Sequence, residues 1–135
     1  ASRRGYASPI QPDSASTDND YNAALTLILN HLNHMAVFIG THHEYSVALA
    51  AELLTEQGYP LDHVHVHVDQ LFGMSDHISF NAAAAGLNTA KYLPFGPVRD
   101  VLPYLFRRAE ENTSVEGQTG RELSLIQKEL ERRKG

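Results

Sequence analysis

The chain has 135 residues, a formal net charge of −5 at pH 7 and no cysteine. This length allows one domain with a hydrophobic core, and the acidic balance argues against a nucleic-acid-binding surface. The absence of cysteine excludes disulfides and thiolate metal sites, and no apolar run approaches the roughly 20 residues of a membrane-spanning helix.

The N-terminal segment differs in composition from the rest of the chain. Residues 1–19 are rich in Ser, Pro and Asp and lack hydrophobic periodicity, so they are predicted to form a loop or tail. Asp18 or Asp20 is a candidate cap for a helix over 21–34. The remaining residues, 20–135, are predicted to form one domain.

Strands and helices are predicted to alternate through the middle of the chain. The apolar run 35–40 predicts a strand covered on both faces, and the alternation over 64–71 predicts a strand with two different faces. Helices are predicted over 44–57 and 75–85, and a third strand over 89–95. The inner stripe of the first of these helices is expected to contain Tyr45, Ala48, Ala51, and Leu53 or Leu54.

The segment after the third predicted strand has the clearest chemical pattern. Pro97 suits the first turn of a helix, whereas Pro103 predicts that this helix starts late or kinks. One helical face carries residues spaced i, i+3, i+4 and i+7, namely Tyr104, Arg107, Arg108 and Glu111. Arginines beside a tyrosine can bind an anion, since guanidinium binds carboxylate bidentately and stacks on aromatic rings. The alternative is a solvated face with an Arg107–Glu111 ion pair.

The other face of this helix is apolar, and a last helix is predicted beyond it. The apolar residues expected to pack against the body of the protein are Leu102, Leu105, Phe106 and Ala109. The last helix is predicted over 122–133, with a charged, solvated end.

The order of elements predicts an α/β fold with a parallel sheet and right-handed crossovers. Three parallel strands alone leave open apolar edges, and a (β/α)8 barrel needs about 250 residues. The chain therefore resembles the C-terminal portion of such a barrel, with about three βα units plus a terminal helix. Barrel chemistry lies where strands end, so a site is expected at 41–43, 71–74 and 92–96.

Histidines form a second candidate site. They lie along the second predicted strand and at the end of the first, at His42, His43, His63, His65 and His67. An H-x-H pair on a strand can bind one metal, with Asp69 and Asp76 as further ligands, which keeps a metal-dependent hydrolase open. The alternative is that these are polar side chains at strand ends that hydrogen-bond to one another. The sequence offers no third and fourth ligand at a defined spacing, so we predict no metal.

Taken together, four motifs resemble proline dehydrogenase of the FAD-dependent, mitochondrial type. They are R-G-Y-A-S-P-I-Q-P, G-T-H-H-E-Y, Q-L-F-G-M-S-D, and K-Y-L-P-F-G-P-V followed by L-P-Y-L-F-R-R-A-E-E-N. The resemblance implies the C-terminal part of the catalytic barrel, which oxidises L-proline to Δ1-pyrroline-5-carboxylate with FAD in the first step of proline catabolism. It further implies a quinone as electron acceptor and a place on the matrix side of the mitochondrial inner membrane.

The same resemblance implies roles for individual residues. The implied substrate-binding residues are Arg107 and Arg108 for the carboxylate, Tyr92 and Tyr104 as aromatic walls, and Leu71 over the ring. The implied flavin contacts are Thr41 and His42, and Glu111 is implied to hold its helix in place. No residue is assigned a catalytic role, because the cofactor carries the chemistry. Two positions depart from the family pattern, His43 in place of Asn and Phe95 in place of Tyr.

The chain lacks the family's first five strands, which carry a lysine, an aspartate and another arginine of the site. The alternative function is therefore a non-catalytic truncated barrel that acts only by association with another chain. That partner is the missing N-terminal half of the barrel or a second copy in a homo-oligomer.

Overall fold

The computed structural model describes residues 5, 6, 8, 10–114, 124, 127, 128 and 130–133. Their elements are α1 (Ser14–Leu29), β1 (Val37–Gly40), α2 (Glu44–Glu56), β2 (Val66–Leu71), α3 (Asp76–Ala85), β3 (Thr89–Tyr92) and α4 (Val98–Ser114). The predicted alternation of helices and strands is confirmed. The last predicted helix falls largely outside the described residues.

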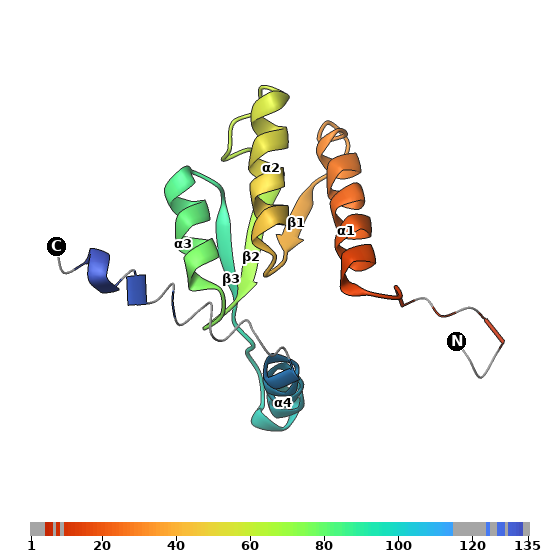
Figure 1. Ribbon diagram of the computed structural model, residues 1–135, viewed down its shortest axis with the longest axis vertical. Helices are drawn as coiled ribbons and strands as arrows, with labels where there is room; N and C mark the ends of the chain where they lie inside the picture. The colour runs from red at the N-terminus through yellow and green to blue at the C-terminus, as the bar shows by residue number, and fades with distance from the viewer. Residues whose placement is uncertain are drawn as a thin grey trace.

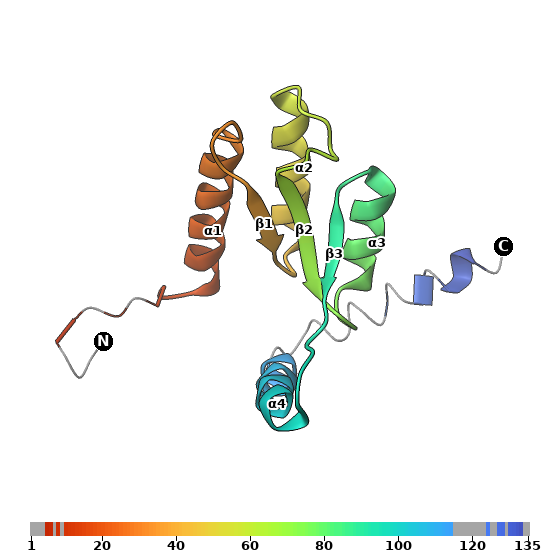
Figure 2. The same cartoon turned by 180° about the vertical axis from the view of Figure 1, so that it is seen from behind.

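The three strands form one parallel sheet in the order β1-β2-β3. Helices α1, α2 and α3 all lie on one side of this open sheet, and no other element among the described residues covers its other face (Figures 1 and 2). The burial of side chains agrees, because Ile39 of β1 is fully buried whereas its neighbour Phe38 is 60% exposed. The prediction that this strand is covered on both faces is therefore wrong. The sheet is a small α/β unit, and its place in a closed barrel stays a prediction.

The hydrophobic core lies between the sheet and its helical layer. Its buried apolar side chains are Leu25, Leu29, Leu32, Ile39, Val47, Ala50, Leu54, Val66, Val68, Ile78, Ala82 and Leu87. The predicted inner stripe of α2 is wrong at two positions, because Tyr45 and Ala48 are exposed. Ser46 is buried instead, and its hydroxyl donates a hydrogen bond of 2.7 Å to Asn22 Oδ1 on α1. Val47, the next residue of α2, is also buried in the core.

Helix α1 begins earlier than the sequence pattern predicts. Its N-cap is Asp13, whose carboxylate accepts a hydrogen bond of 2.7 Å from the backbone N–H of Ser16. This hydrogen bond also holds the pKa of Asp13 below its ordinary value. Residues 14–19 therefore belong to a helix, and the prediction of a loop up to residue 19 is wrong. These residues lack an apolar pattern, but the Asp13 cap satisfies the N-terminus of a helix that includes them. The division into a tail and a barrel-type domain otherwise stays a prediction.

Helix α4 lies beyond the carboxyl ends of the strands, away from the helical layer (Figures 1 and 2). The predicted late start is wrong, because the Pro97 carbonyl accepts hydrogen bonds from Asp100 and Val101 at 2.9 and 3.1 Å and so starts the helix before Pro103. The expected packing of the apolar face is also wrong, since Leu105 is 43% and Phe106 62% exposed. No helix among the described residues is long and apolar enough to cross a membrane.

Candidate functional site

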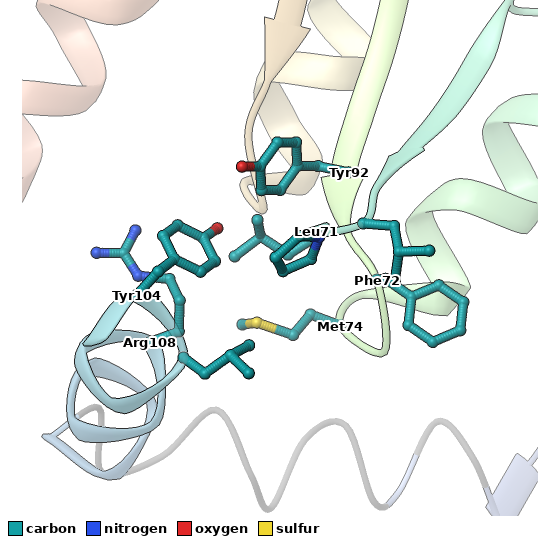
Figure 3. A pocket seen from close by; sticks show the side chains of 9 residues that line it. Leu71, Phe72, Met74, Tyr92, Tyr104 and Arg108 are labelled. Carbon is teal, nitrogen blue, oxygen red and sulfur yellow. The ribbon is translucent and has the colours of Figure 1, made fainter. Parts of the chain in front are cut away.

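A pocket of about 230 Å³ lies where β2, β3 and α4 meet. It is lined by Leu71, Phe72, Met74, Tyr92, Leu93, Pro94, Tyr104, Leu105 and Arg108. Figure 3 shows that these side chains come from the end of β2 and its following turn, from β3, and from α4. The predicted convergence of the second and third strand ends is therefore confirmed.

Two tyrosines form an aromatic wall of this pocket. The ring centroids of Tyr92 and Tyr104 are 5.7 Å apart, and the ring planes meet at 64°. Leu71 is the register partner of Tyr92, and the backbone N–H of Phe72 donates to the Tyr92 carbonyl at 2.9 Å. Because register partners in a parallel sheet point to the same face, Leu71 and Tyr92 project together from the uncovered side. This arrangement fits a small, partly apolar ring.

Arg108 supplies the positive charge among the pocket-lining side chains. It lies one helical turn after Tyr104, and its Cζ atom is 5.3 Å from the centroid of the Tyr104 ring (Figure 3). At this distance the aromatic quadrupole attracts the guanidinium, whose planar fork of N–H groups matches the geometry of a carboxylate. The pocket thus combines apolar and aromatic walls with one group suited to a carboxylate.

The structure does not place the neighbouring residues Arg107 and Glu111 at the pocket. Arg107 is exposed and is not among the residues that line the pocket. Glu111 lies in α4, but its side chain falls outside the described residues. Carboxylate binding by Arg107, the structural role of Glu111 and the alternative Arg107–Glu111 ion pair all stay predictions.

The pocket also contains residues to which the sequence analysis assigned no individual binding role. They are Phe72, Met74, Leu93 and Pro94, which lie within the strand ends expected to form a site, and Leu105, which was expected to pack against the body of the protein. The first four lie in the motifs Q-L-F-G-M-S-D and K-Y-L-P-F-G, so the signal was the motif itself rather than the charge or aromatic character of single residues.

Thr41 and His42 lie at the end of β1, partly buried and outside the pocket lining. The Thr41 hydroxyl accepts a hydrogen bond from the His43 backbone N–H at 3.1 Å, and its carbonyl accepts one from Gln70 Nε2 at 3.2 Å. His42 Nδ1 is hydrogen-bonded to Ser75 Oγ at 2.8 Å. Both residues are thus fixed at the same end of the sheet as the pocket while keeping exposed surface. That placement fits contacts with a large cofactor along this edge.

Asp69 is a carboxylate on the uncovered face of the sheet. Its register partners are Gly40, which has no side chain, and Ala90, which has only a methyl group, so neither neighbour in the sheet crowds the carboxylate. Partial burial raises the pKa of Asp69 above its ordinary value of 3.8, while a backbone hydrogen bond at Tyr92 and the charges of His42 and Lys91 act in the opposite direction.

Of the five histidines of the second candidate site, His63 and His65 contact each other, with ring centroids 5.3 Å apart and the His65 backbone N–H donating to His63 Nδ1 at 3.2 Å. His42 and His43 bond to two different serines, Ser75 and Ser46. His65 Nδ1 lies 3.1 Å from the Leu32 carbonyl, and the His67 ring stacks on Phe38 at 5.6 Å. Within the described ranges, no group of three or more His, Asp or Glu side chains is arranged to hold a metal ion. The histidines therefore take part in local structural contacts.

Fold and pocket together define an α/β protein with an aromatic, arginine-bearing site at the carboxyl ends of parallel strands. The family model described as "Proline dehydrogenase" matches residues 1–121. The chain belongs to the proline dehydrogenase family of enzymes.

Curated relatives cover nearly the whole chain. It is 43% identical over 137 residues to human "Proline dehydrogenase 1, mitochondrial" and 39% identical over 137 residues to human "Hydroxyproline dehydrogenase", each alignment covering 98% of this chain. "Proline dehydrogenase 1, mitochondrial" of Caenorhabditis elegans is 38% identical over 134 residues, or 96% of the chain. The chain spans only 23%, 30% and 22% of the lengths of these three relatives. No solved structure gives a significant match.

Proposed function

We propose that this chain is the C-terminal part of the (β/α)8 barrel of an FAD-dependent enzyme that oxidises L-proline to Δ1-pyrroline-5-carboxylate. Membership of the family and identity to relatives named as proline dehydrogenases support this proposal. The one-sided helical layer and open parallel sheet support the barrel, because the uncovered face corresponds to a barrel interior.

One observation supports a specific binding site for the proposed substrate. Leu71, Tyr92, Tyr104 and Arg108 come from three different elements and line the same pocket. In the proposed complex, Arg108 binds the proline carboxylate, Leu71 packs on the ring, and the two tyrosines close the sides. Fixing the carboxylate in this way orients the ring carbon that reacts, which is the contribution of proximity to the rate. Arg107 adds a second donor to the carboxylate in this proposal, and Glu111 holds α4.

The residues at the end of β1 fit a role in holding FAD, since Thr41 and His42 are fixed yet partly exposed. When bound, FAD supplies the oxidant that accepts a hydride from C5 of the substrate. The protein supplies binding and orientation. A quinone as the final acceptor and a mitochondrial location on the matrix side of the inner membrane complete the proposal; the names of the human and worm relatives include "mitochondrial".

The alternative function is association without catalysis. It is favoured by the uncovered sheet face and by the exposed apolar side chains of Phe38 at 60% and Phe106 at 62%. In this alternative the chain binds the N-terminal half of the barrel or a second copy, and it holds no flavin alone.

Titration of the purified chain with FAD, followed by flavin fluorescence, tests the proposal. Saturable quenching and subsequent oxidation of proline are expected if the strand ends of this chain build the site. His42→Ala should weaken the quenching, whereas the matched control His34→Ala, an exposed histidine in the turn before β1, should not. Absence of quenching, together with a defined oligomer in sedimentation, would instead support the association alternative.

A further inference from the structure

Lys91 occupies β3 directly before Tyr92 but faces the other side of the sheet. Its register partner is Gln70, which is 1% exposed on the helix-covered side. Successive side chains of a strand point to opposite faces. Lys91 therefore points toward the helical layer while Tyr92 points toward the pocket.

The Lys91 ammonium joins β3 to the turn that follows β2. Nζ donates a hydrogen bond of 2.7 Å to the Met74 carbonyl and lies 2.8 Å from Asp76 Oδ1. The Lys91 side chain is 24% exposed, so water screens these contacts only in part. Met74 itself lines the pocket, and its side chain lies across from Tyr104 and Leu71 (Figure 3). One cation thus connects the two strand ends whose side chains form the pocket.

Helix stabilisation does not account for this lysine. Its ammonium lies at the amino end of α3, where the helix dipole disfavours a positive charge. The turn it contacts is conformationally demanding, since Gly73 has φ 78° and Ser75 has φ 49°. Ser75 is the one non-glycine residue with positive φ in the described part of the chain. A turn of this kind needs external contacts to keep a single conformation.

We propose that Lys91 is a positioning residue: by holding the Met74 carbonyl and Asp76, it fixes the Met74 side of the pocket against Tyr92 and Tyr104. The size of the pocket, and with it the relative activity toward an unsubstituted and a hydroxylated ring, depends on this contact. The effect on substrates rests on the proposed function, whereas the Lys91 contact does not.

The test uses the full natural polypeptide that carries this chain, in three variants. Lys91→Leu removes both contacts, and Lys91→Arg keeps the charge and the donors. Glu44→Gln is the matched control, because it removes the carboxylate charge from the 2.9 Å contact between Glu44 and His77, which joins α2 to the same helix α3 and includes no pocket-lining residue.

The first measurement is amide hydrogen exchange at Met74, whose N–H is bonded to the Leu71 carbonyl at 3.0 Å. Exchange should be faster in Lys91→Leu and unchanged in Lys91→Arg and Glu44→Gln. Equal exchange in Lys91→Leu and the wild type would overturn the proposal, whatever the protein catalyses.

The second measurement is steady-state kinetics with proline and hydroxyproline. Because Lys91 acts through Met74 and does not touch the substrate, Lys91→Leu should raise KM for proline severalfold, with little change in kcat. The ratio of kcat/KM for proline to kcat/KM for hydroxyproline should fall, whereas simple destabilisation lowers both values in proportion. An unchanged ratio would overturn the positioning role. If the wild type oxidises neither substrate but exchange is faster in Lys91→Leu, the role of the Lys91 contact is supported and the proposed function is rejected.

Discussion

Replacing Arg108 by Met tests the proposed carboxylate site most directly. The guanidinium is partly buried at the pocket, and its Cζ atom lies 5.3 Å from the Tyr104 ring centroid. Methionine keeps much of the side-chain length and apolar contact but removes the charge and every donor. The fold should tolerate the change, since α4 lies outside the hydrophobic core.

The expected size of the effect follows from the lost hydrogen bonds. A hydrogen bond that involves a charged group contributes about 1.5 to 3 kcal/mol, so KM for proline should rise about 10- to 150-fold. Arg108→Lys keeps the charge but loses the planar fork and the stacking on Tyr104, so it should fall between wild type and Arg108→Met. The value of kcat should change less than KM, because the carboxylate is bound in both the ground state and the transition state.

The assay is steady-state proline oxidation in the flavin-loaded protein, with flavin content and Tm measured for each variant. Arg99→Met is the matched control, since Arg99 lies on the same helix, is 86% exposed and contacts only the exposed Asp100 at 3.5 Å among the ion pairs described. Its KM should stay within about twofold of the wild type. A KM for Arg108→Met equal to that of Arg99→Met, at full flavin content, would refute carboxylate binding by Arg108.

Two further predictions concern the uncovered face of the sheet. Tyr92→Ser removes a pocket-lining ring, so it should improve kcat/KM for hydroxyproline relative to proline; an unchanged ratio would contradict a role for Tyr92 in ring selection. Burial raises the pKa of Asp69 above 3.8, so the folded state holds this proton more tightly and stability falls as pH rises through the raised pKa. Asp69→Asn should therefore have a higher Tm than the wild type at pH 7, with the difference shrinking as the pH falls through the raised pKa toward 3.8; a lower Tm at pH 7 would contradict this sign.

The sequence by itself determined the order of helices and strands and the main residues of the pocket. Hydrophobic alternation located β2, because a strand with one buried face must place apolar side chains at every second residue. The glycine at position 86 ended α3 where expected, since it adopts φ 98° as a left-handed cap. Motif likeness brought Leu71, Tyr92, Tyr104 and Arg108 into one hypothesis before any contact was known.

Only the tertiary structure decided which faces are covered and which polar contacts hold the site. A cap at Asp13 extends α1 beyond its apolar pattern, and in α2 Ser46 is buried with its hydroxyl bonded to Asn22 while Tyr45 is exposed. The contact of Lys91 with Met74 joins residues 17 positions apart, and no local pattern encodes it. Its existence depends on the parallel register of β2 and β3, which is a property of the folded sheet alone.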